Sequence, residues 1–183
     1  MPPAPPLAVD LDGTLALDDT TGICMGLLWR DHPWQMLGLP LWLWRGRAHA
    51  KREMARRVEL DPARLRYHGP FLEFLRQERS RGRLLVLATG SDQKVADRVA
   101  GHLGIFQEVF ASDGRVNLTS TRKAAALVAR FGQRGFDYAG NHPKDLPAWR
   151  LARHAILVNC PRRLVAQVQA EGLPHTVFPP PGS

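Results

Sequence analysis

The sequence predicts an α/β fold in which a parallel sheet is sandwiched by helices, with a small helical cap inserted between the first and second core strands. Short apolar runs typical of buried strands alternate with helical patterns along most of the chain. About seventy residues, 13–83, separate the first two of these runs, far more than one crossover helix needs. The length of 183 residues fits one compact domain with a modest insertion.

The core strands are predicted from short apolar runs that end in polar or small residues. The first run, 7–11, ends at Asp12. Pro70 suits the first turn of the helix that precedes the second strand. The elements after the insertion are expected in this order: helix 70–79, strand 84–88, helix 91–103, a short strand near Val109, helix 121–131, strand 136–139, helix 146–153, strand 155–158, helix 161–171 and strand 175–178.

The insertion, 16–68, is expected to form the helical cap, and 7–15 with 69–178 the core. The first part of the insertion holds four of the five tryptophans, and its second part, 45–66, is strongly basic. The proline-rich ends, 1–6 and 179–183, are predicted as unpacked tails.

The composition narrows the classes of function. With 44% hydrophobic and 23% charged residues the chain can bury a core. The net charge of +8 suits an anionic partner, but no nucleic-acid-binding pattern accompanies the dispersed arginines, so nucleic acid is not an expected partner. Cys24 and Cys160 are too isolated for a disulfide framework or a structural zinc site. Without an apolar run of about 18 residues or a signal-peptide pattern, a cytoplasmic location is expected.

Two carboxylates follow the first strand, in the segment Asp10-Leu11-Asp12-Gly13-Thr14-Leu15. The period of two in a strand places Asp10 and Asp12 on the same side. Neighbouring anions repel unless one is protonated or a hard cation such as Mg²⁺ neutralises them, and both conditions suit phosphate-ester chemistry. Gly13 can bring backbone N–H groups close to an anion. A polar turn after a strand is the alternative.

Hydroxyl groups follow the second strand, in the segment Ala88-Thr89-Gly90-Ser91. A hydroxyl and the free N–H groups of a helix that begins near Ser91 would form an anion site. Alternatively, Thr89 or Ser91 only caps that helix.

Lys123, one of only four lysines, stands in the first turn of the helix predicted for 121–131, where Ser120 or Thr121 can form the cap. A cation at this place opposes the helix dipole and invites a compensating anion. An ordinary solvated lysine is the alternative.

Asn141 and Asp145 follow the strand predicted for 136–139. The amide oxygen of Asn141 can bind Mg²⁺, although without a negative charge, and Asp145 adds an acid within reach. The alternative is a polar turn before a helix.

Taken in order, these four segments resemble the motifs of the haloacid dehalogenase superfamily. That family has DxDGT after its first strand, a Thr or Ser at the end of the next core strand, then a lysine, and finally a glycine and aspartate followed by another acid. Asn141 departs from the usual aspartate. The resemblance implies a Rossmann-like sheet with the site at the carboxyl ends of its strands and a cap between the first two motifs. The stretch 136–149, with 157–159, also looks like the domain often found fused to UbiA-type prenyltransferases.

The resemblance implies a Mg²⁺-dependent phosphomonoester hydrolase that acts through an aspartyl-phosphate. Asp10 would attack phosphorus, and Asp12 would serve as acid and base. The presence of Asp12 favours a phosphatase over a dehalogenase. The expected phosphate ligands are Gly13, Thr89, Gly90 and Lys123. The expected Mg²⁺ ligands are Asp10, Asp12, Asn141 and Asp145.

The expected substrate is a phosphorylated small molecule or a lipid-linked phosphate. The apolar run 36–44 and the basic residues after it suit peripheral contact with the inner face of an anionic membrane through 27–57, unless they form an ordinary cap core. Two other functions stay open. One is a non-catalytic partner domain of a membrane prenyltransferase, which Asn141 favours and the intact carboxylate pair disfavours, and the other is phosphotransfer to an acceptor other than water.

Overall fold

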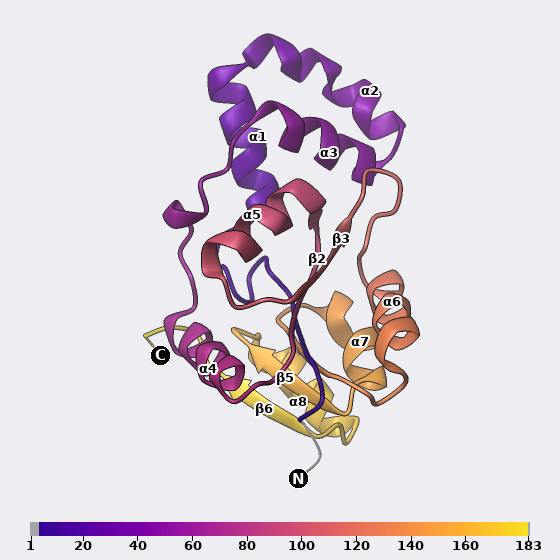
Figure 1. The fold of residues 1–183 in the computed structure, drawn as a ribbon. Coiled ribbons are helices and arrows are strands. Elements are labelled where there is room, and N and C mark those ends of the chain that lie inside the picture. The colour runs from indigo at the N-terminus through magenta and orange to yellow at the C-terminus, as the bar shows by residue number, and fades with distance from the viewer. Residues whose placement is uncertain (1–3, 183) are drawn as a thin grey trace.

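The computed structural model describes residues 4–182 and contains one six-stranded sheet in which every pairing is parallel (Figure 1). The order across the sheet is β3-β2-β1-β4-β5-β6. This confirms the predicted α/β fold with a parallel sheet. The strands are β1 (Leu7–Val9), β2 (Leu85–Asp92), β3 (Glu108–Ser112), β4 (Asp137–Gly140), β5 (His154–Val158) and β6 (His175–Phe178).

Helices cover both faces of the sheet because alternate strand residues point to opposite sides. On one face, Val9 and Leu87 pack with α4 (Gly69–Ser80) and α5 (Gln93–Leu103). On the other face, Ala8 and Val86 pack with a second group of helices. That group consists of α6 (Thr121–Phe131), α7 (Leu146–Leu151) and α8 (Arg162–Ala170).

The chain changes direction across the sheet at β1. It first builds β2 and β3 on one side of β1, then returns and adds β4, β5 and β6 on the other side. In open α/β sheets, such a switch point leaves a crevice at the carboxyl ends of the strands, where ligands bind. The segments that follow β1, β2 and β4 therefore meet at one edge of the sheet.

Two predicted element boundaries are wrong near this edge. The first strand ends at Val9 and not at Asp12, because the chain then turns and the N–H of Ala16 bonds back to the carbonyl of Leu11. The helix expected to begin near Ser91 begins at Gln93. β2 continues to Asp92, whose carboxylate accepts the N–H of Lys94 and caps α5.

The predicted tails are partly packed. The carbonyl of Pro5 accepts a hydrogen bond from Arg83, and that of Pro6 accepts the N–H of Asp137. At the other end, the carbonyl of Pro179 bonds the ring of His68. Residues 1–3 and Ser183 lie outside the described residues.

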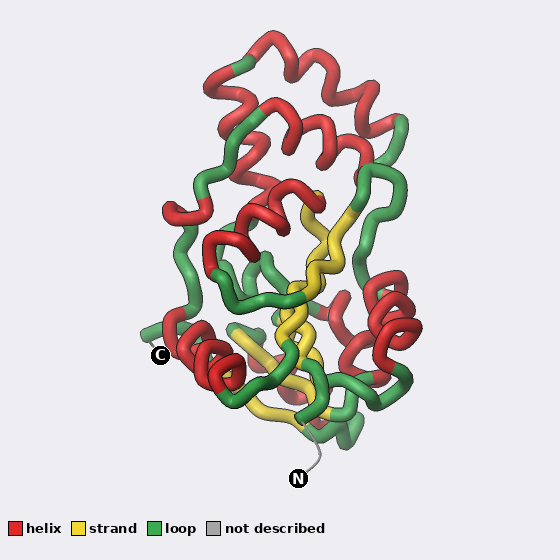
Figure 2. The backbone as a smooth tube through the Cα atoms, in the orientation of Figure 1, coloured by secondary structure: helices red, strands yellow, loops and turns green. Residues whose placement is uncertain are grey.

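Helices α1 (Thr20–Asp31), α2 (Leu39–Trp44) and α3 (Arg47–Arg57) occupy the part of the chain predicted as a cap and form the upper end of the molecule in Figures 1 and 2. Two 3₁₀ turns, η1 (Pro33–Gly38) and η2 (Pro62–Arg64), complete this segment. Leu28 and Met54 join the same apolar cluster as β1, so the segment packs onto the core. No helix within residues 4–182 is long and apolar enough to span a bilayer.

Candidate active site

A cavity of about 290 Å³ lies at the carboxyl ends of β1, β2 and β4 and brings together six of the eight predicted site residues. Those six are Asp10, Asp12, Gly90, Lys123, Asn141 and Asp145. The other two predicted residues, Gly13 and Thr89, do not line it. Side chains that the motifs did not indicate complete the lining: Asp19, Thr21, Arg47, Lys51, Thr119, Ser120, His142 and Lys144.

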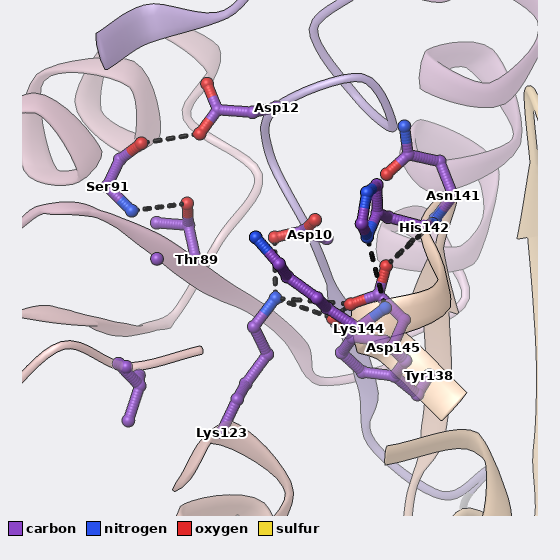
Figure 3. Close-up of polar contacts among 12 residues, drawn as sticks. Asp10, Asp12, Thr89, Ser91, Lys123, Tyr138, Asn141, His142, Lys144 and Asp145 are labelled. Carbon is purple, nitrogen blue, oxygen red and sulfur yellow. Dashed lines mark hydrogen bonds and ion pairs between the residues drawn. The ribbon is translucent and has the colours of Figure 1, made fainter. Parts of the chain in front are cut away.

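The centre of the cavity is an ion pair between Asp10 and Lys123 (Figure 3). The Nζ atom of Lys123 lies 2.7 Å from Oδ1 of Asp10, and both side chains are almost fully buried. The first turn of α6 places the lysine there, as the sequence pattern predicted. Asp10 is fixed from the other side because its N–H bonds to the carbonyl of Ala139 in β4.

Asp145 holds this pair in place. Its Oδ1 accepts a 2.7 Å hydrogen bond from the hydroxyl of Tyr138 and lies 3.5 Å from the Nζ of Lys123. Its Oδ2 accepts the backbone N–H groups of Asn141 and His142 at 3.1 and 3.0 Å. Both oxygens thus accept hydrogen bonds from the protein, which fixes the carboxylate next to Lys123 and the loop of Asn141, and the role of Asp145 as a metal ligand stays a prediction.

Tyr138 is the member of this network that the sequence analysis missed. Its hydroxyl accepts a 2.8 Å hydrogen bond from Lys123 and donates to Asp145. It lies in the strand predicted for 136–139, and its ring is fully buried. A hydroxyl needs a partner when it is buried, and this requirement is the one signal in the sequence that pointed to the network.

Burial and the neighbouring charges together shift the pKa values of the central pair. Burial raises the pKa of Asp10 to about 7, an effect that Lys123 opposes and Asp145 reinforces. Burial alone would lower the pKa of Lys123, but the carboxylates of Asp10 and Asp145 outweigh it, and the pKa is raised. The lysine therefore keeps its positive charge next to Asp10.

Asp12 faces away from this pair, contrary to the prediction that it shares a strand side with Asp10. Since β1 ends at Val9, Asp12 belongs to a turn and the period of two does not apply. Its carboxylate accepts the N–H of Thr20 at 2.7 Å and the hydroxyl of Ser91 at 2.5 Å (Figure 3). The first turn of α1 and the end of β2 therefore fix Asp12 at the border of the cavity.

Gly13 packs closely against the side chain of Asn141. Its φ of +76° is one that side-chain-bearing residues avoid, and a Cβ there would lie 2.1 Å from the amide nitrogen of Asn141. Only glycine lets the two segments approach this closely. The glycine thus shapes the site without lining it.

Thr89 and Gly90 differ in position although they are adjacent. Thr89 is fully buried, and its hydroxyl accepts the N–H of Ser91 at 3.0 Å. Gly90 lines the cavity, and its carbonyl accepts the Nζ of Lys51 at 2.6 Å. The helix start predicted near Ser91 is wrong, because α5 begins two residues later with Asp92 as its cap, and the anion-binding role of this segment stays a prediction.

The sequence and the fold of this chain were compared with protein families, curated proteins and solved structures. The sequence profile of the haloacid dehalogenase-like hydrolase family matches residues 7–150. Protein y4nM of Sinorhizobium fredii (strain NBRC 101917 / NGR234) is 38% identical over 154 residues, which are 84% of this chain and 30% of that protein. The chain thus spans about a third of the length of this curated relative.

Solved structures share the fold at low sequence identity. A protein of unknown function from Bordetella pertussis Tohama I is similar with a TM-score of 0.70 and 18% identity, over 96% of this chain and 98% of that chain. An apo phosphoserine phosphatase is similar with a TM-score of 0.62 and 13% identity, over 95% and 92% of the two chains. The profile match covers most of the chain and includes every motif that lines the cavity, so the protein belongs to the haloacid dehalogenase-like hydrolase family.

Proposed function

We propose that this hydrolase cleaves phosphomonoesters through a covalent phosphate on Asp10, with Mg²⁺ as its cofactor. The observation that supports the proposal best is the buried Asp10–Lys123 pair, which Asp145 and Tyr138 hold at the carboxyl ends of the parallel strands. Such a site offers a carboxylate nucleophile next to a fixed positive charge, as phosphoryl transfer requires. A phospho-aspartyl intermediate analogue of a phosphoserine phosphatase has the same fold, with a TM-score of 0.62 at 13% identity.

The oxygen atoms available in the cavity fit Mg²⁺, although fewer of them belong to acidic side chains than in a site built from carboxylates alone. Within residues 4–182, no three His, Cys, Asp or Glu side chains gather around one possible ion. The oxygen donors are the carboxylate of Asp10, the main-chain carbonyl of Asp12 and the amide of Asn141, and hard cations prefer such ligands. Asp145 acts by holding the loop of Asn141 through two N–H groups. When bound, Mg²⁺ supplies positive charge against the phosphoryl oxygens.

The residues of the chain divide the reaction into two displacements. In the first, a carboxylate oxygen of Asp10 attacks phosphorus, the ester P–O bond breaks, and the leaving oxygen takes a proton from Asp12. In the second, Asp12 accepts a proton from water as the water oxygen attacks phosphorus. The bond between phosphorus and Asp10 breaks, and inorganic phosphate leaves. Lys123 stabilises the negative charge of the phosphoryl oxygens in both steps.

A phosphate-release screen tests the proposal. It covers sugar, nucleotide, amino-acid and prenyl-linked phosphomonoesters, with and without Mg²⁺, and uses Asp10→Asn as the control. We expect Mg²⁺-dependent release of phosphate that the substitution abolishes. Activity that survives in Asp10→Asn would reject the covalent mechanism.

A further inference from the structure

Three cationic side chains line the cavity but take no part in the chemistry described above. Arg47 and Lys51 come from α3, and Lys144 comes from the 3₁₀ turn η3 (Pro143–Asp145) after β4. Figure 3 shows the side chain of Lys144 extending toward the centre of the site. Two segments almost a hundred residues apart thus direct positive charge at one cavity.

None of the three has a carboxylate partner within ion-pair distance in the described part of the chain. Lys51 donates only to neutral oxygens, the carbonyl of Gly90 at 2.6 Å and the amide of Asn117 at 3.4 Å. Burial lowers the pKa of Lys51, and the nearby charges of Arg47 and Lys144 lower it further, while Asp12 and Asp19 oppose them. Arg47 and Lys144 therefore both lie close enough to Lys51 to repel its charge.

The positions of the charged groups separate these three cations from the rest of the site. The fourth cation of the cavity, Lys123, already pairs with Asp10 at 2.7 Å and lies 3.5 Å from Asp145. Arg47, Lys51 and Lys144 have no such partner in the described part of the chain, so they are the cations that a substrate anion can reach.

We infer that the substrate carries a second anionic group besides the ester phosphate, and that Arg47, Lys51 and Lys144 bind this group. The inference rests on the proposed phosphatase function and names its substrate class. A carboxylate and a second phosphate both have the required chemistry. The neutral acceptors of Lys51 leave it free to reorient toward such a group.

Binding of non-hydrolysable phosphonates tests this inference independently of turnover. The ligands are an alkylphosphonate with a terminal carboxylate, the same molecule as its neutral amide, and the matching bisphosphonate. Titration calorimetry with Mg²⁺ should show the carboxylate or the bisphosphonate binding at least about tenfold more tightly than the amide, as expected for a charge-assisted contact. The better of the two identifies the second anion.

Two variants locate the contact. Arg47→Gln and Lys144→Gln should each remove most of the preference for the charged ligand, whereas Arg45→Gln, an exposed residue of the same segment outside the cavity lining, should keep it. Equal binding of charged and neutral phosphonates by the unmodified protein, or no binding of either, overturns the inference. A preserved preference without any phosphate release from monoesters would instead reject the proposed function alone.

Exposed apolar side chains indicate a second binding surface, on the helical segment at the upper end of the molecule in Figure 1. Nine large hydrophobic side chains are exposed within residues 4–182, and seven of them lie in 25–44. Trp34 and Trp44 are each 83% exposed, whereas Trp42 is buried beneath Arg57. We call the seven residues the apolar tip: Met25, Trp29, Trp34, Leu37, Leu41, Leu43 and Trp44.

Charge indicates what covers the apolar tip. Residues 20–57 contain seven Lys and Arg against two acids. Tryptophans next to basic side chains are typical of surfaces that lie in the interface of an anionic bilayer. The structure therefore points to peripheral docking of this tip on an anionic lipid surface.

Vesicle flotation at low salt tests the docking. We expect the protein to float with vesicles of equimolar phosphatidylglycerol and phosphatidylcholine but not with phosphatidylcholine alone, and Trp34→Ala/Trp44→Ala should lose this binding. Val177→Ser, which alters an exposed apolar residue away from the tip, should not. No flotation of the unmodified protein, or full flotation of the double variant, overturns the docking. Loss of a dimer in the double variant, without vesicle binding by the parent, would identify a second copy as the occupant and would equally overturn it.

Discussion

Asp145→Asn should destabilise the fold strongly although it changes one atom. Asp145 is 3% exposed, and its two oxygens accept from Tyr138, Lys123 and two backbone N–H groups. Whichever way the new amide is turned, its NH₂ group faces donors and leaves them without acceptors. Each unsatisfied buried donor costs about 1–3 kcal/mol, and breaking a buried charge pair costs about 3–5 kcal/mol. We therefore expect a loss of about 3–5 kcal/mol, a large share of a typical stability of about 5–15 kcal/mol.

Urea unfolding followed by tryptophan fluorescence measures this loss. Asp31→Asn is the matched control, because it makes the same chemical change in a solvent-exposed pair with Arg30 and should leave the midpoint unchanged. Tyr138→Phe removes one hydrogen bond of the network and should cost about 1–2 kcal/mol, and the double variant should lose less than the sum because the residues share partners. A loss below about 1 kcal/mol for Asp145→Asn, at an unchanged denaturant slope, would refute the reasoning.

Three further outcomes are expected. Asn141→Asp should tighten Mg²⁺ binding in titration calorimetry, because it adds a negative charge to the oxygen donors, and unchanged or weaker binding would count against the role of Asn141. Arg83→Met should lower the free energy of unfolding by about 3 kcal/mol, since buried Arg83 pairs with Glu78 and Asp137, whereas Arg153→Met at the exposed end of the same network should cost less than about 1 kcal/mol. Thr14→Val should raise stability by about 1 kcal/mol in a thermal melt, because the hydroxyl of Thr14 is buried and lacks a hydrogen-bond partner within residues 4–182; a lower Tm would show that it is satisfied in solution.

The sequence was sufficient to predict the fold because the patterns that indicate strands and helices are both local. Strands buried on two faces appear as continuous apolar runs, and helices 121–131 and strand 175–178 were predicted with the bounds that the structure has. The errors in the predicted element boundaries lie where a strand ends earlier or later than its apolar run. At Asp10 the chain leaves the sheet early, and at Asp92 it stays in the sheet, and neither event changes the apolar pattern.

The candidate site was predictable where a residue lies at or near the end of a core strand or starts a helix. Asp10 and Asn141 follow β1 and β4, and Gly90 lies near the end of β2, so one switch point brings them together whatever the side chains are. Arg47 and Lys51 stand on a helix of the inserted segment, and the packing of that helix on β2 and α5, which no period in the sequence encodes, decides that they face the cavity.

The direction of the Asp12 side chain shows how the same packing bears on catalysis. Its two partners, Thr20 and Ser91, come from the first turn of α1 and from β2, and their hydroxyls also bond each other at 2.8 Å. The inserted segment and the core therefore hold the proposed general acid jointly. A shift of α1 relative to β2 would break this set of contacts and release the carboxylate toward the cavity that it borders. The inserted segment thus carries two of the three cationic side chains, Arg47 and Lys51, and through Thr20 it also sets the position of the proposed proton donor. The proposed binding of a second anion and the proposed protonation of the leaving oxygen therefore depend on the same packing.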